Sequence, residues 1–127
     1  MPQYEKHFTV EEANDLLPEL RQLLERVREI RDSLTIEWER AQPILAAAQQ
    51  NGGGKEASGY VSDLTRLNAA LRDFQRRGVV IKDIDQGLVD FPHMRDGREV
   101  FLCWKLSEDE VRFWHDLESG YAGREPI

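Results

Sequence analysis

The sequence predicts an α+β fold, in which an N-terminal antiparallel helical hairpin packs on a small C-terminal antiparallel β-meander. Apolar residues recur at spacings of three and four through much of the first 77 residues, which is typical of amphipathic helices. Residues 51–54 read Asn-Gly-Gly-Gly and interrupt this pattern. After Gly78, β-branched runs separated by turn residues are typical of strands. These three observations carry the prediction of the fold class.

Length and composition exclude several classes of protein. We expect a single domain over residues 1–127, because this is the length of one ordinary domain. Lys and Arg total 17 against 24 for Asp and Glu, and the net charge of −7 disfavours partners such as nucleic acid or an anionic membrane. A lone cysteine, Cys103, excludes an internal disulfide and favours a reducing, cytoplasmic location. We expect neither a signal peptide nor a membrane-spanning segment.

The first helix is expected over residues 9–50. Thr9 and Glu12 form a capping box at its start. Pro18 has no N–H to donate to the carbonyl of Asn14, so we expect the long helix to be kinked or broken there. Beyond it lies a coiled-coil-like apolar seam that only Glu37 interrupts. The members of this seam are Leu20, Leu23, Val27, Ile30, Leu34, Ala41, Ile44 and Ala48.

The second helix is expected over residues 58–77, after a flexible hairpin tip at 51–57. Gly78 then supplies a left-handed cap. At 1.5 Å per residue this helix is roughly 30 Å long, whereas residues 18–50 would span roughly 50 Å. The shorter helix therefore covers only the later part of the longer one. We expect the start of the apolar seam to be buried elsewhere, against the β part or a second subunit.

A β-meander is expected over residues 78–117, followed by an irregular tail over 118–127. The expected strands cover residues 79–84, 88–91, 99–106 and 111–117. Pro92 ends the second strand or places it at an edge, and Asp96 with Gly97 is a strong hairpin signal. Ser107 and Glu110 could form a capping box that favours a helix over 111–117. The alternation of apolar residues there favours a strand, and we expect a strand.

Several ordered motifs of the C-terminal part are distinctive. They are Gly78 with Lys82-Asp83, Gly87-Leu88-Val89-Asp90-Phe91-Pro92, Arg95-Asp96-Gly97-Arg98-Glu99-Val100, Leu102-Cys103-Trp104, Trp114-His115, and Gly123-Arg124 with Pro126-Ile127. Together with Phe8-Thr9, Ala13 and Leu16-Leu17-Pro18, they resemble a bacterial family known as domain of unknown function 2203. The resemblance runs from about residue 8 to the C-terminus. It implies no reaction, ligand or catalytic residue.

Candidate metal ligands lie in the β part. If the strands form a meander, Asp83, Asp90 and His115 could converge on one face. Two carboxylates and a histidine suit a divalent metal ion, as in a facial Fe(II) site or a catalytic zinc site with an open position. Alternatively, Asp83 or Asp90 pairs with a nearby Arg or Lys in a partly buried network, and His115 caps a turn. The spacing of these residues does not distinguish the two.

Other side chains suggest anion binding or nucleophilic chemistry. Arg95, Arg98 and Arg124 could grip a carboxylate or phosphate, because a guanidinium donates two parallel hydrogen bonds to such groups. Cys103 lies between apolar residues, so a small buried side chain is a better interpretation than a nucleophile paired with His115.

Two functions remain open. The first hypothesis is an interaction module that self-associates or binds a protein partner through its helices. The second is a small metal-binding or anion-binding domain, or an enzyme, with its site in the β part. No seryl triad, zincin helix or dinucleotide-binding glycine motif is present, which leans against an enzyme of a common class.

Overall fold

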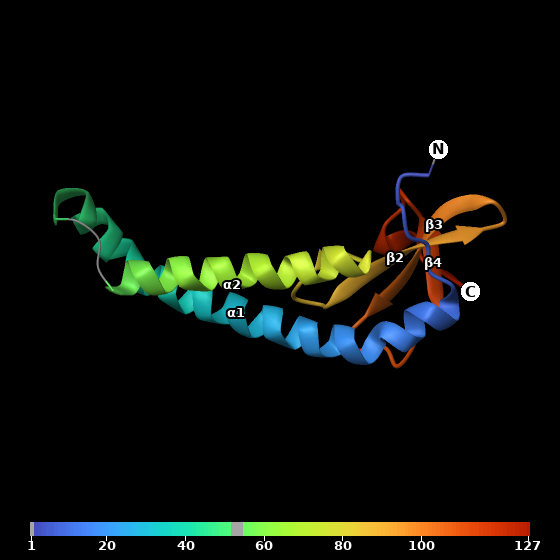
Figure 1. Cartoon of the computed structure of the whole chain (residues 1–127), viewed down its shortest axis with the longest axis horizontal. Helices are drawn as coiled ribbons and strands as arrows, with labels where there is room; N and C mark the ends of the chain where they lie inside the picture. Colours follow the sequence, from blue (N-terminus) through green and yellow to red (C-terminus); the bar gives the residue numbers. More distant parts are fainter. Residues whose placement is uncertain (1, 52–54) are drawn as a thin grey trace. The chain divides into compact units, whose positions relative to one another are not determined.

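The computed structural model describes residues 2–51 and 55–127, and it describes side chains for 2–40, 42–43 and 59–127. Over these residues the chain forms two helices followed by a five-stranded antiparallel sheet, which confirms the α+β class (Figure 1). It divides into two compact units. Met1–Leu24 and Asp73–Ile127 form the sheet unit, and Glu25–Arg72 form the helical unit. The single domain expected from the length stays a prediction.

Helix α1, Val10–Asn51, begins at the predicted capping box. The Glu12 amide donates to Thr9 Oγ1, and the Thr9 amide donates to Glu12 Oε1, both at 3.0 Å. The helix continues through Pro18, so the predicted break between two helices is wrong (Figure 1). Pro18 itself is exposed, whereas Leu17 and Leu20 on either side of it are buried. Burial of both flanking turns holds them in one helix despite the hydrogen bond that proline cannot make.

Helix α2, Lys55–Arg77, begins three residues before the predicted start. Residues 55–57 of the predicted flexible tip are therefore helical, and residues 52–54 lie outside the described chain. The rings of Trp38 and Tyr60 lie 5.5 Å apart, and the side chains of Glu37 and Asp63 share a hydrogen bond. Residues 37 and 38 of α1 thus contact residues 63 and 60 of α2, so the two helices run in opposite directions. The helical unit is an antiparallel hairpin, as predicted.

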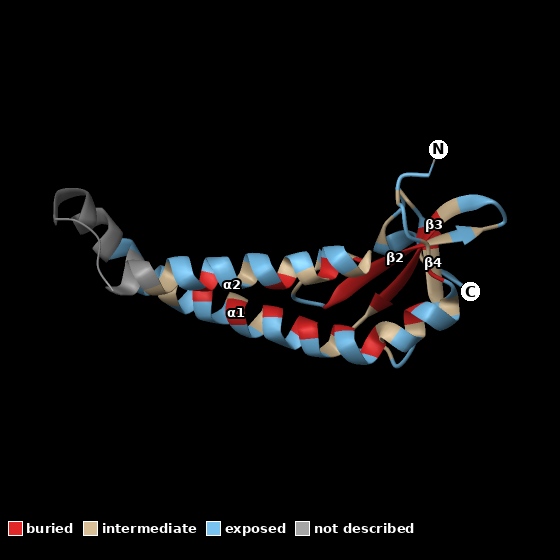
Figure 2. Ribbon diagram, viewed as in Figure 1, coloured by how far each residue is buried: buried red, intermediate tan, exposed pale blue. Residues whose placement is uncertain are grey.

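The apolar seam is covered within the chain as far as its side chains are described. Leu20 and Leu23 are buried, and so are the next three members, Val27, Ile30 and Leu34 (Figure 2). Burial of this stretch therefore requires no second subunit. The last three predicted members, at 41, 44 and 48, lie outside the described side chains.

The sheet has the order β1-β2-β3-β4-β5, and every neighbouring pair is antiparallel. Its strands are β1 Val80–Asp83, β2 Leu88–Arg95, β3 Arg98–Lys105, β4 Phe113–Asp116 and β5 Glu125–Pro126. The strand predicted within 111–117 is confirmed as β4. The tail over 118–127 is more regular than expected, because a short 3-10 helix, Tyr121–Gly123, precedes β5. A two-residue strand gives no alternation that a sequence pattern could detect.

Strand β2 passes through Pro92 instead of ending there. The Phe8 amide donates to the carbonyl of Pro92 at 2.7 Å, so that carbonyl points away from β3. The nitrogen of a strand residue points to the same side as its carbonyl, and the missing N–H therefore removes no bond to β3. On this outer side β1 pairs only with Leu88–Asp90, which leaves Pro92 at an edge. The edge alternative of the prediction is the correct one.

The pairing register separates the two faces of the sheet. Phe91 lies opposite Leu102, and Val89 lies opposite Trp104. This face contacts the start of α1, since the Arg21 guanidinium lies 5.2 Å from the Trp104 ring; we call it the helix-side face. The other face of the sheet contains Asp90 of β2 and its cross-strand neighbour on β3, Cys103.

Candidate functional site

Three potential metal ligands converge on the face opposite the helix-side face. Asp90 on β2 lies opposite Cys103 on β3, and Cys103 lies opposite Phe113 on β4. His115 is two residues beyond Phe113 and therefore points to the same side. The carboxylate, thiol and imidazole ligand atoms all lie within 4.8 Å of one another, and the three residues are at most 2% exposed. We call Asp90, Cys103 and His115 the buried cluster.

The hydrogen bonds of His115 direct one ring nitrogen into the buried cluster. Its Nδ1 lies 2.6 Å from the carbonyl oxygen of Asp116, which can only accept, so we assign the proton to Nδ1. Its Nε2 lies 3.1 Å from both carboxylate oxygens of Asp90. A contact between Nε2 and this carboxylate requires a second proton between them.

Burial disfavours negative charge on both acidic members of the buried cluster. Burial raises the pKa of Asp90, although His115 and the hydrogen bond from Cys103 oppose this shift. Burial, together with the Asp90 charge, raises the pKa of the Cys103 thiol to about 12. The thiol is therefore protonated at neutral pH, which argues against Cys103 as an activated nucleophile. A metal ion would reverse this preference, because coordination deprotonates a thiol.

The buried cluster differs from the predicted ligand set by one member. Asp90 and His115 meet as predicted, but Asp83 lies apart from them. Its Oδ1 accepts from the amide of Gln86 at 3.1 Å in the turn after β1. The register between β1 and β2 shifts between Ile81 and Asp83, which is a change that the alternation could not reveal. Cys103 takes the place that the prediction gave to Asp83.

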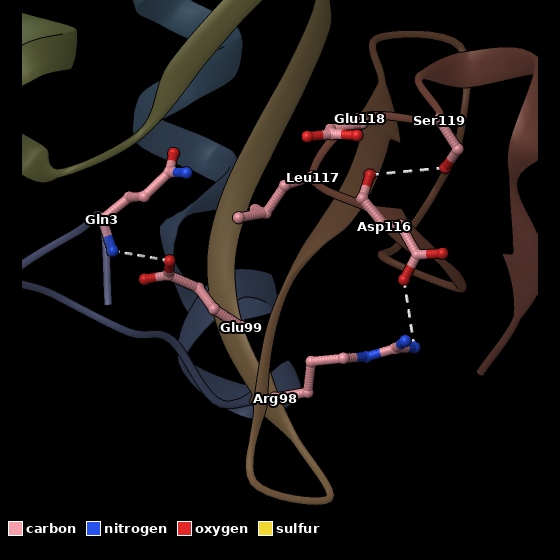
Figure 3. Close-up of a pocket in the computed structure, with 7 residues that line it drawn as sticks. All are labelled: Gln3, Arg98, Glu99, Asp116, Leu117, Glu118 and Ser119. Carbon is pink, nitrogen blue, oxygen red and sulfur yellow. Dashed lines mark hydrogen bonds and ion pairs between the residues drawn. The ribbon is translucent and has the colours of Figure 1, made fainter. Parts of the chain in front are cut away.

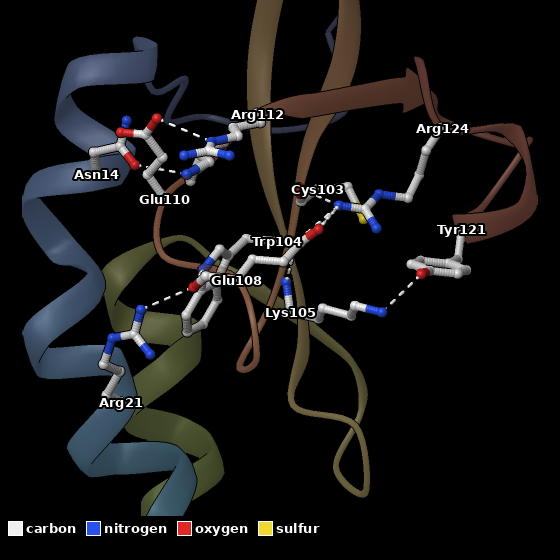
Figure 4. Close-up of polar contacts among 11 residues, drawn as sticks. Asn14, Arg21, Cys103, Trp104, Lys105, Glu108, Glu110, Arg112, Tyr121 and Arg124 are labelled. Atoms are coloured by element: carbon white, nitrogen blue, oxygen red, sulfur yellow. Dashed lines mark hydrogen bonds and ion pairs between the residues drawn. The ribbon is translucent and has the colours of Figure 1, made fainter. Parts of the chain in front are cut away.

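Arg124 lies on the cluster side of the sheet. Its guanidinium carbon is 4.0 Å from the centroid of the Phe113 ring and 4.7 Å from that of Tyr121. Its Nη2 donates to both carboxylate oxygens of Glu108, at 2.8 and 2.7 Å (Figure 4). The backbone amide of Lys105 donates to the same carboxylate at 2.9 Å. Glu108 thereby fixes Arg124 beside strand β3.

The other two candidate anion-binding arginines lie elsewhere. The Arg95 guanidinium lies 4.6 Å from the Trp114 ring, and Arg98 forms a 3.0 Å ion pair with Asp116. Trp114 lies opposite Leu102 on the helix-side face, whereas Phe113 beneath Arg124 lies on the other face. The structure thus brings Arg95 and Arg98 together and separates them from Arg124.

A cavity of about 450 Å³ lies in the sheet unit beside the ion pair of Arg98 and Asp116 (Figure 3). It is lined by Gln3, Arg98, Glu99, Asp116, Leu117, Glu118 and Ser119. Glu99 accepts hydrogen bonds from the Gln3 amide at 2.7 Å and the Tyr4 amide at 3.1 Å. Burial raises the pKa of Glu99, but these bonds and a contact with His7 outweigh it and hold the pKa below its usual value. This cavity includes no member of the buried cluster and carries mainly acidic groups.

Comparison with known proteins identifies the family of the chain. Within the described residues, neither helix has the length and apolar character needed to cross a membrane. None of the curated proteins and none of the solved structures compared with the chain matches it. A family model described as an uncharacterized conserved protein, DUF2203, matches residues 6–127. Since this match covers nearly the whole chain and agrees with the resemblance of the motifs, the chain belongs to the DUF2203 family.

Proposed function

We propose that this protein binds a divalent transition-metal ion at Asp90, Cys103 and His115. One observation carries the proposal: three different ligand types from three neighbouring strands converge, almost fully buried, within 4.8 Å. Buried polar side chains reduce stability unless all their hydrogen-bonding groups are satisfied. Without metal these three groups bond to one another, and a metal ion would replace those hydrogen bonds by three coordinate bonds.

The ligand chemistry favours zinc or another borderline-soft ion. A thiolate and an imidazole select against magnesium and calcium, which prefer oxygen ligands. In tetrahedral zinc sites, nitrogen and oxygen ligands lie about 3.3 Å apart. His115 Nε2 and the Asp90 oxygens are separated by 3.1 Å, so these two ligands need little movement. Three protein ligands leave a fourth position open, as in catalytic zinc sites.

The bond from His115 Nδ1 to the Asp116 carbonyl also supports the proposal. Metal-bound histidines usually donate their second ring N–H to a carbonyl or carboxylate, which fixes the ring and the tautomer. Here this bond leaves Nε2 as the nitrogen that faces Asp90 and Cys103. Metal binding would then release two protons, one from the Cys103 thiol and one shared by His115 and Asp90.

The test is metal affinity, measured on metal-stripped protein by competition with a chromophoric chelator. We expect the Cys103→Ser and His115→Gln variants to bind Zn²⁺ at least about 100-fold more weakly than the parent, since loss of outer-shell partners alone costs 10–100-fold. Asp83→Asn is the matched control, because this carboxylate lies outside the buried cluster, and it should bind as the parent does. Equal affinity of the parent and Cys103→Ser would overturn the proposal.

Protein–protein interaction through the helical unit is a second candidate function. The sequence suggested this function by an apolar seam that the second helix does not fully cover. The structure removes this argument, because the seam is buried from Leu20 to Leu34. A different observation supports it: Ile36, Trp38, Val61 and Leu64 are exposed apolar side chains of this unit. Light scattering over a range of concentrations would test it. Self-association that Val61→Glu abolishes would support this function, and a monomer at every concentration would count against self-association.

The proposed site also has a preferred compartment. A thiolate ligand must stay reduced, and Cys103 is a free cysteine. We therefore propose a cytoplasmic location, where thiols are kept reduced.

A further inference from the structure

Arg124 has a buried hydrogen-bond donor with no acceptor. Its side chain is only 10% exposed, and Nη2 is bound to Glu108. Its Nε is fully buried and has no partner among the described residues. Buried donors are nearly always paired, so an exception requires an explanation, such as a missing water or ion. A guanidinium with one unpaired N–H is suited to an oxygen of an anion.

The Arg124 guanidinium lies beside one member of the buried cluster, Cys103. The guanidinium covers the Phe113 ring, and Phe113 lies directly opposite Cys103 and two residues before His115. Arg124 Nη2 also donates to the backbone carbonyl of Cys103 at 3.5 Å (Figure 4). The positive charge of Arg124 also acts to lower the pKa of the Cys103 thiol, because it stabilises the thiolate. Arg124 is therefore a neighbour of the proposed metal position.

The charges around the proposed metal favour an anion. A divalent ion bound by the Asp90 carboxylate and the Cys103 thiolate forms a neutral unit. Lys82 acts on Asp90 from the β1 side, where its Nζ lies 4.9 Å from the Phe101 ring centroid. Arg124 adds a second positive charge, and Glu108 offsets only one of the two. Outside the cluster, the charged groups that act on Asp90 and Cys103 thus include two cations, Lys82 and Arg124, and one anion, Glu108.

We propose that the metal-loaded site binds a small oxyanion, a carboxylate or a phosphate, at the open metal position, with Arg124 as a hydrogen-bond donor to it. This inference rests on the proposed metal binding. It assigns to Arg124 the anion-binding role that the sequence suggested, and it gives none to Arg95 and Arg98, which lie elsewhere in the sheet unit.

The experiment uses Co²⁺ as a spectroscopic metal. Co²⁺-loaded protein is titrated with acetate and, separately, with inorganic phosphate at constant ionic strength, and the visible absorption bands of the metal are followed. We expect a saturable spectral change with at least one anion. The anion that acts at the lower concentration identifies the ligand class. Arg124→Lys keeps the charge but loses Nε and the planar fork, and should weaken anion binding at least about tenfold with Co²⁺ affinity unchanged.

Arg98→Lys is the matched control, because it makes the same substitution at an exposed arginine that lies away from the buried cluster. This variant should retain anion binding. Equal weakening in both variants would overturn the role of Arg124. A cobalt spectrum that neither anion alters would overturn the oxyanion proposal and leave metal binding standing. Failure to bind either Co²⁺ or Zn²⁺ would overturn both proposals.

Discussion

The buried pair of Asp90 and His115 makes a measurable prediction about stability. His115→Leu removes the imidazole and leaves Asp90, 1% exposed, without its main partner. Among the described residues, its carboxylate then keeps the hydrogen bond from Cys103 and the attraction of the Lys82 charge. Breaking a buried pair on one side typically costs about 3–5 kcal/mol. This is a large share of the roughly 5–15 kcal/mol that stabilises a domain.

Replacing both partners should have a different effect. Asp90→Leu combined with His115→Leu leaves no unpaired charge and adds apolar contacts on the sheet. Such double replacements are often neutral or stabilising, so we expect the double variant to recover most of the loss. The coupling between the two positions should therefore be at least about 2 kcal/mol.

The assay is urea unfolding of the metal-free proteins in the presence of a chelator. Trp104 and Trp114 both lie in the sheet unit, so in a Trp38→Phe background their fluorescence reports on the part that contains the pair. Asp116→Asn, an exposed carboxylate next to His115, is a control that should change stability by less than about 0.5 kcal/mol. A loss below about 1 kcal/mol for His115→Leu would refute the reasoning, as would a double variant whose loss equals the sum of the two singles.

Three further predictions concern other parts of the chain. Burial and its neighbour Asp63 raise the pKa of Glu37 above 4.5, so protonated Glu37 stabilises the helical hairpin at low pH, and this contribution should disappear as the pH rises through the raised pKa. Hydrogen exchange in the hairpin as a function of pH measures it, and Glu37→Gln should remove the dependence. Glu99 has the opposite sign, because its pKa is lowered below 4.5: its hold on the N-terminal segment should be full above 4.5 and be lost as the pH falls through the lowered pKa, which limited proteolysis of that segment can follow. Gly87→Ala should destabilise by more than Gly97→Ala in thermal unfolding. Both glycines have positive φ, but only at Gly87 would the new Cβ lie 2.7 Å from another atom, the Cβ of Leu106; equal losses would show that the close approach is unimportant.

Local signals in the sequence were sufficient for most of the fold. The capping box at Thr9 and the glycine cap at Gly78 mark real helix ends, because each satisfies backbone groups that a helix leaves unpaired. The break predicted as one alternative at Pro18 is absent, because the effect of the proline depends on tertiary burial of the turns around it, which the helix pattern does not contain. The helix pattern also does not show what buries the start of the apolar seam, so the β part and a second subunit both remained possible.

The sequence also contained more information about the buried cluster than alternation alone reveals. In a hairpin with a two-residue loop at Asp96 and Gly97, residues equally far before and after the loop lie opposite each other. Asp90 and Cys103 are such a pair. The hairpin signal therefore placed these two residues opposite each other. Asp83 could not be excluded in this way, because the irregularity in β1 shifts its register. The position of Arg124 depends on the two-residue strand β5 and had no local signal.

The buried cluster could serve stability or metal binding, and these two explanations predict opposite effects of replacing it by apolar residues. The helix-side face contains apolar residues such as Leu102 and Trp104, whereas the other face places three ionisable groups where apolar ones would pack without a polar penalty. If these groups served only stability, replacing Asp90, Cys103 and His115 together by Leu, Ala and Leu should destabilise the metal-free protein. If they are kept for metal binding, the triple variant should be at least as stable as the metal-free parent, and Zn²⁺ should raise the unfolding temperature of the parent alone. Stability and metal response measured on these two proteins therefore separate a structural cluster from a functional one, because the two explanations predict opposite signs for the same substitution.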